Sequence, residues 1–222
     1  MLLFLRPIYS FDPKVFVTRL SWSETFESGH CPVTKRQVSR HELAELLEQI
    51  GRIAYNAGSR AGLTPAQWTA LRFFSRANRF SRTVSAFAEF HSTTRGTASQ
   101  TIKGLVQQGY LTRCRSERDA RSSSLKTTQK TLAALEYDPL EDLVQAAGVV
   151  SERTRATLAV HLTLVLGELA ARRGRRYFGS CTSCAHFQGA GLPGAEYFCG
   201  LVREQLAATE IEQICVKFQP GS

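Results

Sequence analysis

The chain has 222 residues, 43% of them hydrophobic, and a formal net charge of +9. This length is enough for one sizeable core, or for one domain with a small appendage. No apolar run approaches the ~20 residues that span a bilayer, and the segment from Leu2 to Leu5 is too short for the core of a signal peptide. We therefore expect a cytoplasmic protein without membrane association, whose thiols stay reduced.

The positive charge is concentrated in the middle of the chain. Between Arg72 and Lys130 there are twelve basic and three acidic residues, whereas the remainder is neutral. A basic segment on a balanced body is typical of a protein that binds a polyanion. Charge alone does not separate DNA from RNA or from an anionic membrane, and a solvated basic face would have the same composition.

The N-terminal residues 1–38 show no sustained periodicity, and we expect them to form an arm of unassigned function. The first helix is predicted after Ser39, which forms an S-x-x-E capping box with Glu42. Apolar residues then recur at helical spacing from Leu43 to Ala57. Gly58 is the expected end of this helix.

Two further helices are predicted before residue 91. Thr64 and Gln67 form a second capping box with Pro65 at the first helical position, and this helix is expected to bury Trp68, Leu71 and Phe74. The third helix carries Val84, Phe87 and Phe90.

A turn at residues 91–93 leads to the fourth helix, from about Thr94 to Gln108. Its apolar residues share one face, and Arg95, Ser99 and Lys103 share the opposite face, with Gln100 beside them. Such a polar and basic stripe suits a helix in the DNA major groove, where these side chains bond base edges and phosphates. An ordinary solvated helix face would look similar.

Two short strands, 110–115 and 123–128, are predicted after Gly109 ends this helix. The polar and basic segment 116–122 between them forms the tip of the expected hairpin. Helix, turn, helix and basic hairpin together indicate a winged helix-turn-helix. The tip of such a wing can reach the minor groove, where arginine is attracted by the negative potential.

The segment after the wing is predicted to be helical. Thr128 can cap a helix to about Glu136, Asp138 and Glu141 form another capping box, and Ser151 opens a long apolar helix that ends near Gly174. These helices exceed what a small winged-helix core needs, and we expect them to form a dimer interface.

The expected fold class is therefore mainly α with a small β-wing: a winged helix-turn-helix with long dimerisation helices and a C-terminal cysteine-rich appendage. The predicted divisions are an arm at 1–38, the winged-helix domain with its dimerisation helices at 39–174, and the tail at 175–222. Within residues 39–174, the stretch 94–111 and the segment Arg118-Asp119-Ala120-Arg121-Ser122 resemble the recognition helix and the D-x-R wing tip of the multiple antibiotic resistance regulator (MarR) family. Thr127 and Thr131 depart from the family pattern, which usually has leucine and glycine there.

The resemblance implies a homodimeric transcriptional regulator, usually a repressor, that binds a palindromic operator in double-stranded DNA and is no enzyme. It also implies that Arg121 contacts the minor groove and that Asp119 pairs with the wing arginines. The candidate DNA-contacting residues are Thr94, Arg95, Ser99, Gln100, Lys103, Arg113, Arg115, Arg118, Asp119 and Arg121.

Four of the six cysteines lie in the last 42 residues, at Cys181, Cys184, Cys199 and Cys215. A C-x2-C pair lets two thiolates bind one centre, and two further cysteines complete a set of four sulfur ligands. Zinc ribbons usually contain a second C-x2-C pair, which this tail lacks, so the spacing favours a [2Fe–2S] or [4Fe–4S] cluster. Zinc is the alternative, as is a set of reduced thiols or a redox disulfide, with His186 as a substitute ligand.

Three functions compete. The first is a DNA-binding regulator whose operator affinity changes with an iron–sulfur cluster. The second is a regulator with a structural zinc site and a small aromatic effector, for which Trp68, Phe73 and Phe74 are candidate walls. The third is a redox enzyme or an electron carrier, for which no catalytic motif is present. The glycine-rich segment 189–194 is expected to be a loop, and Cys114 a half-buried strand residue.

Overall fold

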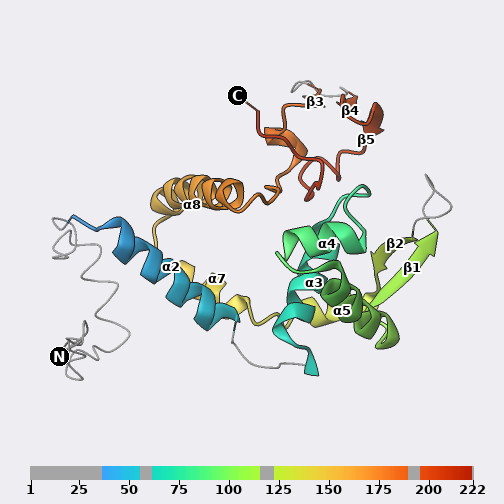
Figure 1. Ribbon diagram of the computed structural model, residues 1–222, viewed down its shortest axis with the longest axis horizontal. Coiled ribbons are helices and arrows are strands. Elements are labelled where there is room, and N and C mark those ends of the chain that lie inside the picture. The colour runs from blue at the N-terminus through green and yellow to red at the C-terminus, as the bar shows by residue number, and fades with distance from the viewer. Residues whose placement is uncertain (1–36, 56–61, 116–122, 190–195, 222) are drawn as a thin grey trace, which may run out of the picture. The chain divides into compact units, whose positions relative to one another are not determined.

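The computed structural model of the chain describes residues 37–55, 62–115, 123–189 and 196–221 (Figure 1). The chain divides into two compact units, residues 1–51 and 52–222, and each is described by itself. Of the predicted arm at 1–38, residues 1–36 lie outside the described residues. So do the helix end at Gly58, the wing tip 116–122 and most of the glycine-rich segment.

The first described helix is α2 (Arg40–Tyr55). The N–H of Glu42 donates to Ser39 Oγ at 3.1 Å, so Ser39 caps the helix as the sequence predicts. Its apolar side chains, including Leu46, Ile50 and Ile53, are exposed in this single chain. A helix with an uncovered apolar stripe gains little stability from its own chain.

Three helices form the helix-turn-helix: α3 (Pro65–Arg76), α4 (Val84–Phe90) and α5 (Arg95–Gln107). The predicted capping box of α3 is present in both directions. Gln67 N–H donates to Thr64 Oγ1 at 3.3 Å, and Thr64 N–H donates to Gln67 Oε1 at 2.8 Å. The hydroxyls of Thr83 and Thr94 cap α4 and α5. Each helix therefore begins at a residue that satisfies an otherwise unpaired N–H group.

The wing is a two-stranded antiparallel sheet of β1 (Leu111–Arg115) and β2 (Ser123–Thr127). Leu111 pairs with Thr127 and Arg115 pairs with Ser123. Gly109, with a φ of +76°, makes the turn from α5 into β1, in a backbone conformation that glycine adopts without strain. The predicted winged helix-turn-helix is confirmed.

One apolar cluster holds these elements together. Phe73 lies at its centre, with ring centroids 5.1 Å from Phe74, 5.7 Å from Phe87 and 4.8 Å from Phe90. Trp68 and Phe74 are each about 2% exposed and Phe73 about 1%, so all three are core residues. The cluster also includes Leu63, Leu71, Ala98, Ile102, Leu105, Tyr110, Leu111 and Leu125.

The junction after the wing is built by two threonines. Thr128 caps α6 (Gln129–Leu135) by accepting from Thr131 N–H, and its hydroxyl donates to the carbonyl of Gly109 at 2.8 Å. Thr131 is fully buried, and its hydroxyl donates to the carbonyl of Tyr110. The departure at Thr131 therefore adds a buried hydrogen bond to the start of the wing.

The predicted capping box at Asp138 and Glu141 is wrong. Helix α7 (Glu141–Ala147) has Leu140 as its N-cap, without a side-chain cap. Asp138 instead accepts from Leu140 N–H at 2.9 Å and pairs with Arg72 of α3 at 2.6 Å. The carboxylate is drawn to the arginine because a partly buried charge gains more from an opposite charge than from a neutral donor.

The long helix α8 (Glu152–Arg172) begins at Ser151 and ends before Gly174, as predicted. No residue along it is buried in the single chain. Its exposed apolar residues are Leu158, Val160, Leu162, Leu164, Val165, Leu166 and Leu169. None of the helices in the described ranges is long and apolar enough to cross a membrane.

The C-terminal tail contains a short 3-10 helix, η4 (Cys181–Ser183), and a three-stranded antiparallel sheet that the sequence did not predict. Its strands are β3 (Phe187–Gln188), β4 (Tyr197–Cys199) and β5 (Glu204–Leu206), with β4 in the middle. The strands have only two or three residues each, too few for a periodicity signal.

Candidate nucleic-acid interface and metal centre

Helix α5 has a buried face and a polar face. Ala98, Ile102 and Leu105 are fully buried against the helices α3 and α4. Arg95, Gln100 and Lys103 are exposed, and Ser99 is half-buried beside them. The structure therefore exposes the predicted polar stripe, and its contact with DNA stays a prediction.

Thr94 stands at the N-terminus of the same helix. It is exposed, and its Oγ1 accepts from Thr97 N–H at 3.1 Å. The neighbouring N–H groups of the first turn carry the positive end of the helix dipole, which attracts phosphate. Thr94 thus has a structural role as a cap, in addition to any contact with DNA.

The wing supplies the second part of the interface. Arg113 is exposed on β1, with its Nη1 3.5 Å from Ser123 Oγ, and Arg115 ends the strand. Arg118, Asp119 and Arg121 lie outside the described residues. Their predicted pairing and minor-groove contact therefore remain predictions.

Several basic residues of the central segment are used inside the fold. Arg72 pairs with Asp138, and Arg79 pairs with Glu204 and Glu210. Lys130 donates to the carbonyl of Gln108 at 2.8 Å, where a cation stabilises the C-terminus of α5. The charge count of the sequence could not distinguish these structural cations from the exposed ones on α5 and β1.

The four predicted ligand cysteines converge on one cavity in the tail. Cys181 and Cys184 come from η4 and its end, Cys199 from β4, and Cys215 from the loop after β5. The cavity has a volume of about 10 Å³ and includes Phe80, Phe187 and Leu206 in its lining. Cys181 and Cys215 are each 6% exposed. Residues 34 positions apart are thus brought to one small, largely apolar space.

Local backbone bonds hold the cysteines in place. Cys184 N–H donates to the carbonyl of Cys181 at 3.0 Å, which closes the C-x2-C turn. Cys181 N–H donates to Ile211, and Cys215 N–H to Gly179, so the two ends of the tail are joined beside the cavity. On β4, Cys199 pairs with Phe187 of β3.

Two of the four thiols, Cys181 and Cys215, have raised pKa values, which favours their neutral form. Burial, together with the smaller effects of the nearby Cys215, Cys199 and Cys184, raises the pKa of Cys181 to about 11. Burial also raises the pKa of Cys215, against the lowering effect of the Asn78 amide and the Lys217 backbone N–H. Four close thiolates repel one another, so a bound cation is what would favour their deprotonation.

No group of three or more His, Cys, Asp or Glu side chains in the described part of the chain is arranged to hold a metal ion as it stands. The shared cavity and the mutual electrostatic effect of the cysteines nevertheless place them together. The four thiols therefore surround one space without a formed coordination sphere. A metal ion would complete such a sphere, because ligand thiols lose their protons when the metal binds.

The winged helix supplies one wall of this centre. Phe80, in the turn between α3 and α4, lines the cavity. The backbone around Cys215 runs along the same turn: Asn78 N–H donates to the carbonyl of Ile214 at 3.0 Å, and Val216 N–H donates to Ser81 Oγ at 2.8 Å. The sequence did not indicate this contact, because polar turn residues carry no periodic signal.

Two other sequence candidates lie elsewhere. His186 Nε2 is 2.8 Å from Gln219 Oε1 and does not line the cavity, so the structure does not support it as a substitute ligand. Cys114 is half-buried on β1, as expected. The described cysteines are all free thiols.

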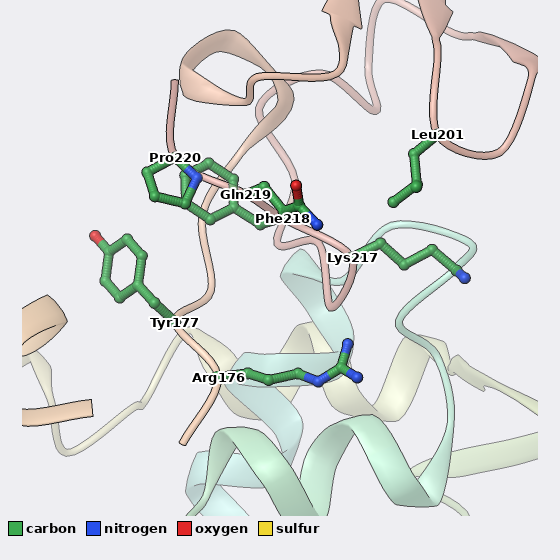
Figure 2. Close-up of a pocket in the computed structure, with 7 residues that line it drawn as sticks. All are labelled: Arg176, Tyr177, Leu201, Lys217, Phe218, Gln219 and Pro220. Carbon is green, nitrogen blue, oxygen red and sulfur yellow. The ribbon is translucent and has the colours of Figure 1, made fainter. Parts of the chain in front are cut away.

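Two larger hollows adjoin the tail. Figure 2 shows the first, of about 370 Å³, with the rings of Tyr177 and Pro220 at the left and the side chain of Lys217 at the right. Lys217 also lines the cysteine cavity. The second hollow, of about 190 Å³, lies between the end of α8 and Phe90 of α4, with Arg173 and Phe178 in its wall.

The model of the MarR family matches residues 61–122 of this chain. Solved structures with a similar fold include a MarR transcriptional regulator from Methanosarcina mazei Go1, with 20% identity and a TM-score of 0.48 over 58% of this chain and 96% of that chain. Wild-type apo MarR from E. coli has 23% identity and a TM-score of 0.46 over 59% and 99% of the two chains. The S. aureus MepR–DNA complex has 17% identity and a TM-score of 0.48 over 59% and 96%. No curated protein sequence matches this chain significantly.

Proposed function

We propose that this chain is a DNA-binding transcriptional regulator of the MarR family that represses by occupying an operator, and the match of residues 61–122 to the family model supports this. One observation carries the proposal. Helix α5 buries one face and exposes a continuous stripe of basic and small polar side chains, next to a hairpin with an exposed arginine. This is the arrangement that enters a major groove while the wing lies along the backbone.

The exposed side chains have different expected roles. Arg95, Gln100 and Lys103 can bond base edges, whereas Thr94 and Arg113 are placed to bind phosphates. Arg118 and Arg121 are proposed for the minor groove. These roles follow from side-chain chemistry and exposure, and they rank Arg95 and Lys103 as the first residues to substitute.

The test begins with selection of bound duplexes from a random-sequence pool, followed by affinity measurements at several salt concentrations. Arg95→Ala should weaken binding to the selected duplex by about 1–3 kcal/mol and relax the preference at one or two base pairs. Arg40→Ala, at the exposed start of α2, is the matched control and should leave the affinity unchanged. Failure to enrich any sequence, or equal losses for both variants, would overturn the proposal.

We propose that α8 pairs with a second copy of the chain. Its exposed leucines and valines are too numerous for a solvent-facing helix. A two-fold dimer would present two α5 helices to a palindromic operator, whose half-sites lie about 34 Å apart. Leu162→Glu should therefore convert a dimer into a monomer in equilibrium sedimentation and weaken operator binding.

We also propose a metal centre on Cys181, Cys184, Cys199 and Cys215 that modulates operator binding. The shared apolar cavity and the adjacent Lys217 support an anionic metal–thiolate group. One C-x2-C pair followed by isolated cysteines supports an iron–sulfur cluster. Loss or oxidation of that cluster would alter the wall that the α3–α4 turn shares with the tail.

A single zinc ion is the second candidate for this centre. The cavity volume of about 10 Å³ corresponds to about one water molecule, which favours one ion over a multi-iron cluster. A tetrahedral set of four thiolates is also a common structural zinc site. In that case the metal would stabilise the tail, and the regulatory signal would be another molecule.

Analysis of iron, sulfide and zinc after anaerobic purification distinguishes the two. Brown protein with iron and acid-labile sulfide, lost in Cys181→Ala, would establish the cluster. Colourless protein with one zinc per chain would establish the single ion. Cys114→Ala is the control, since Cys114 lies on β1 and outside the cavity lining. Metal-free protein with an unchanged Cys181→Ala variant would overturn the metal centre.

The hollow between α8 and α4 is the candidate site for the small aromatic effector of the zinc hypothesis. Phe90 and Phe178 meet edge to face at 5.4 Å, and Arg173 and Arg176 lie in the same wall. An aromatic carboxylate would find an apolar surface and cations there. Release of the selected duplex by such a compound, abolished in Arg173→Ala, is the corresponding measurement.

A further inference from the structure

Asn78 carries a buried amide group with an unused donor. Its side chain is fully buried in the turn between α3 and α4. The Oδ1 atom accepts from Phe80 N–H at 3.2 Å and from Ser81 Oγ at 2.8 Å, which fixes the orientation of the amide. Among the described residues, the Nδ2 atom has no hydrogen-bond partner. A buried donor without a partner is costly and calls for an explanation.

The unused donor belongs to the turn that lines the cysteine cavity: Phe80 of this turn stands in the cavity wall, and Asn78 N–H donates to the carbonyl of Ile214, next to Cys215. The Asn78 amide also lowers the pKa of Cys215, which agrees with this placement. A neutral thiol is a weak acceptor, whereas a metal-bound thiolate is a strong one. A metal-bound Cys215 thiolate would supply the acceptor that the Nδ2 donor lacks.

The turn that carries Asn78 is also attached to the backbone around Cys215. Ile214 N–H donates to the carbonyl of Arg76 at 2.8 Å, and Asn78 N–H donates back to the carbonyl of Ile214 at 3.0 Å. Val216 N–H donates to Ser81 Oγ at 2.8 Å. The residues on both sides of one ligand cysteine are thus held by the turn of the helix-turn-helix.

The same turn continues to the wing. Arg82 Nε donates to the carbonyl of Ala77 at 2.9 Å, and its own carbonyl accepts from Leu125 N–H of β2 at 2.9 Å. The turn therefore has the metal centre on one side and the wing strand on the other. A shift of the turn changes the position of β2 relative to α5.

We propose that Asn78 is the positioning residue that links the metal centre to the DNA-binding surface, by donating Nδ2–H to the Cys215 thiolate when the metal is bound. This inference rests on the four-cysteine centre of the proposed function. Metal binding completes the hydrogen bond and fixes the turn, and through it the wing. Metal loss removes the acceptor and frees the turn. In this proposal, Asn78, which lies outside the C-terminal tail, transmits the presence or loss of the metal to the DNA-binding surface.

Asn78→Asp is the variant that tests this role. It is nearly isosteric and keeps the acceptor for Phe80 and Ser81, but it replaces the donor that faces Cys215 with a carboxylate oxygen. Asn78→Ala removes both functions. Thr69→Val is the matched control, because it removes two partly buried hydrogen bonds within α3, one to the carbonyl of Pro65 and one from Arg72, away from the centre.

The full-length reduced chain is titrated anaerobically with Co(II), whose thiolate charge-transfer band reports sulfur ligation, and each form is then titrated with the selected duplex. We expect Asn78→Asp to keep the spectrum of four sulfur ligands while binding Co(II) about 10- to 100-fold more weakly. Saturating Co(II) should change the DNA affinity of the wild type several-fold and that of Asn78→Asp much less. Circular dichroism of each metal-free variant checks that the winged helix is folded, and Asn78→Ala gives the same comparison should Asn78→Asp unfold.

The outcomes separate this inference from the proposed function. Wild-type Co(II) affinity and a wild-type DNA response in the Asn78 variants would overturn the positioning role, while leaving the metal centre in place. Equal losses in Thr69→Val would also overturn it. A wild-type chain that shows no sulfur-ligated Co(II), or a spectrum unchanged in Cys199→Ser, would overturn the metal centre and this inference with it.

Discussion

Among the described residues, the winged helix buries sixteen apolar side chains in one cluster, whereas the tail from residue 175 onward buries four, of which two are cysteines. The winged helix therefore draws its stability from apolar burial, at about 25 cal/mol per Å². The tail has too small a core to be stabilised by apolar burial, so it needs a further stabilising link, such as a metal site or a contact with another part of the chain. Its described residues offer two: the four cysteines, and the contact with the α3–α4 turn.

This difference predicts that substitution of a ligand cysteine has the largest effect. Structural four-ligand zinc sites have apparent binding free energies of about 10–16 kcal/mol, so Cys184→Ser should abolish stable metal binding and unfold the tail. The winged helix should remain folded, because its core does not include Cys184. Limited proteolysis with mass spectrometry should show new cleavage after residue 175 and a protected segment at 62–135. Cys114→Ser is the control, and equal protection of the tail in Cys184→Ser would show that the cysteines are not this stabilising link.

The second largest effect is expected in the winged-helix core. Phe87 is fully buried, with ring centroids 5.7 Å from Phe73 and 5.8 Å from Phe74. Phe87→Ala should lower the free energy of unfolding by about 3–5 kcal/mol, measured by chemical denaturation followed by circular dichroism. Tyr137→Ala removes an aromatic ring that is 70% exposed and should change it little. Similar losses for the two variants would mean that this cluster is not the main source of stability.

The same contrast explains which elements could be predicted from the sequence. The caps at Thr64 and Thr94, together with the apolar periodicity, predict where α3 and α5 begin, whereas the Thr83 cap of α4 was not predicted. The strands of the wing follow from Gly109 and the family resemblance. At Asp138 the prediction was wrong, because a capping box is a local pattern and the partner that displaced it, Arg72, is 66 residues away.

In the tail, by contrast, the sequence predicts the metal site but not the secondary structure. The C-x2-C pair predicts that four cysteines share a site, and the structure brings them to one cavity. The short strands β3, β4 and β5, and the docking on Asn78 and Ser81, leave no periodic pattern. They are fixed by hydrogen bonds between distant segments, which a single sequence does not reveal.

A third prediction concerns the close packing that joins the two ends of the tail. A Cβ on Gly179 would lie 2.6 Å from Cε2 of the Phe218 ring, so one of the two must move. Gly179→Ala should destabilise the tail by about 1–3 kcal/mol, seen as a lower midpoint for release of the metal during denaturation. Gly167→Ala, on α8, has nothing within 4 Å and is the control. A tail unaffected by Gly179→Ala would indicate that Phe218 is free to rotate away.

The smallest effect is expected for the ion pairs that join the winged helix to the tail. Arg79 reaches from the α3–α4 turn to Glu204 at 3.2 Å and to Glu210, and its guanidinium lies 4.8 Å from the centroid of the Phe80 ring. The arginine side chain is 36% exposed, so water and salt screen these pairs. Arg79→Met keeps most of the apolar stem and should weaken docking by about 1 kcal/mol.

Hydrogen exchange of the Ile214 amide measures this docking directly, because that N–H donates to Arg76 across the contact. We expect faster exchange at this amide in Arg79→Met, and a similar increase when the wild type is placed in high salt. Arg175→Met changes an exposed arginine and should have no effect on it. Exchange in Arg79→Met that stays as slow as in the wild type would assign the docking to the backbone bonds and to Phe178, whose ring lies 6.4 Å from Phe73. Apolar packing would then join the tail to the winged helix, as it holds the helices of the winged helix together. In that case, salt would not change the effect of the metal on DNA binding.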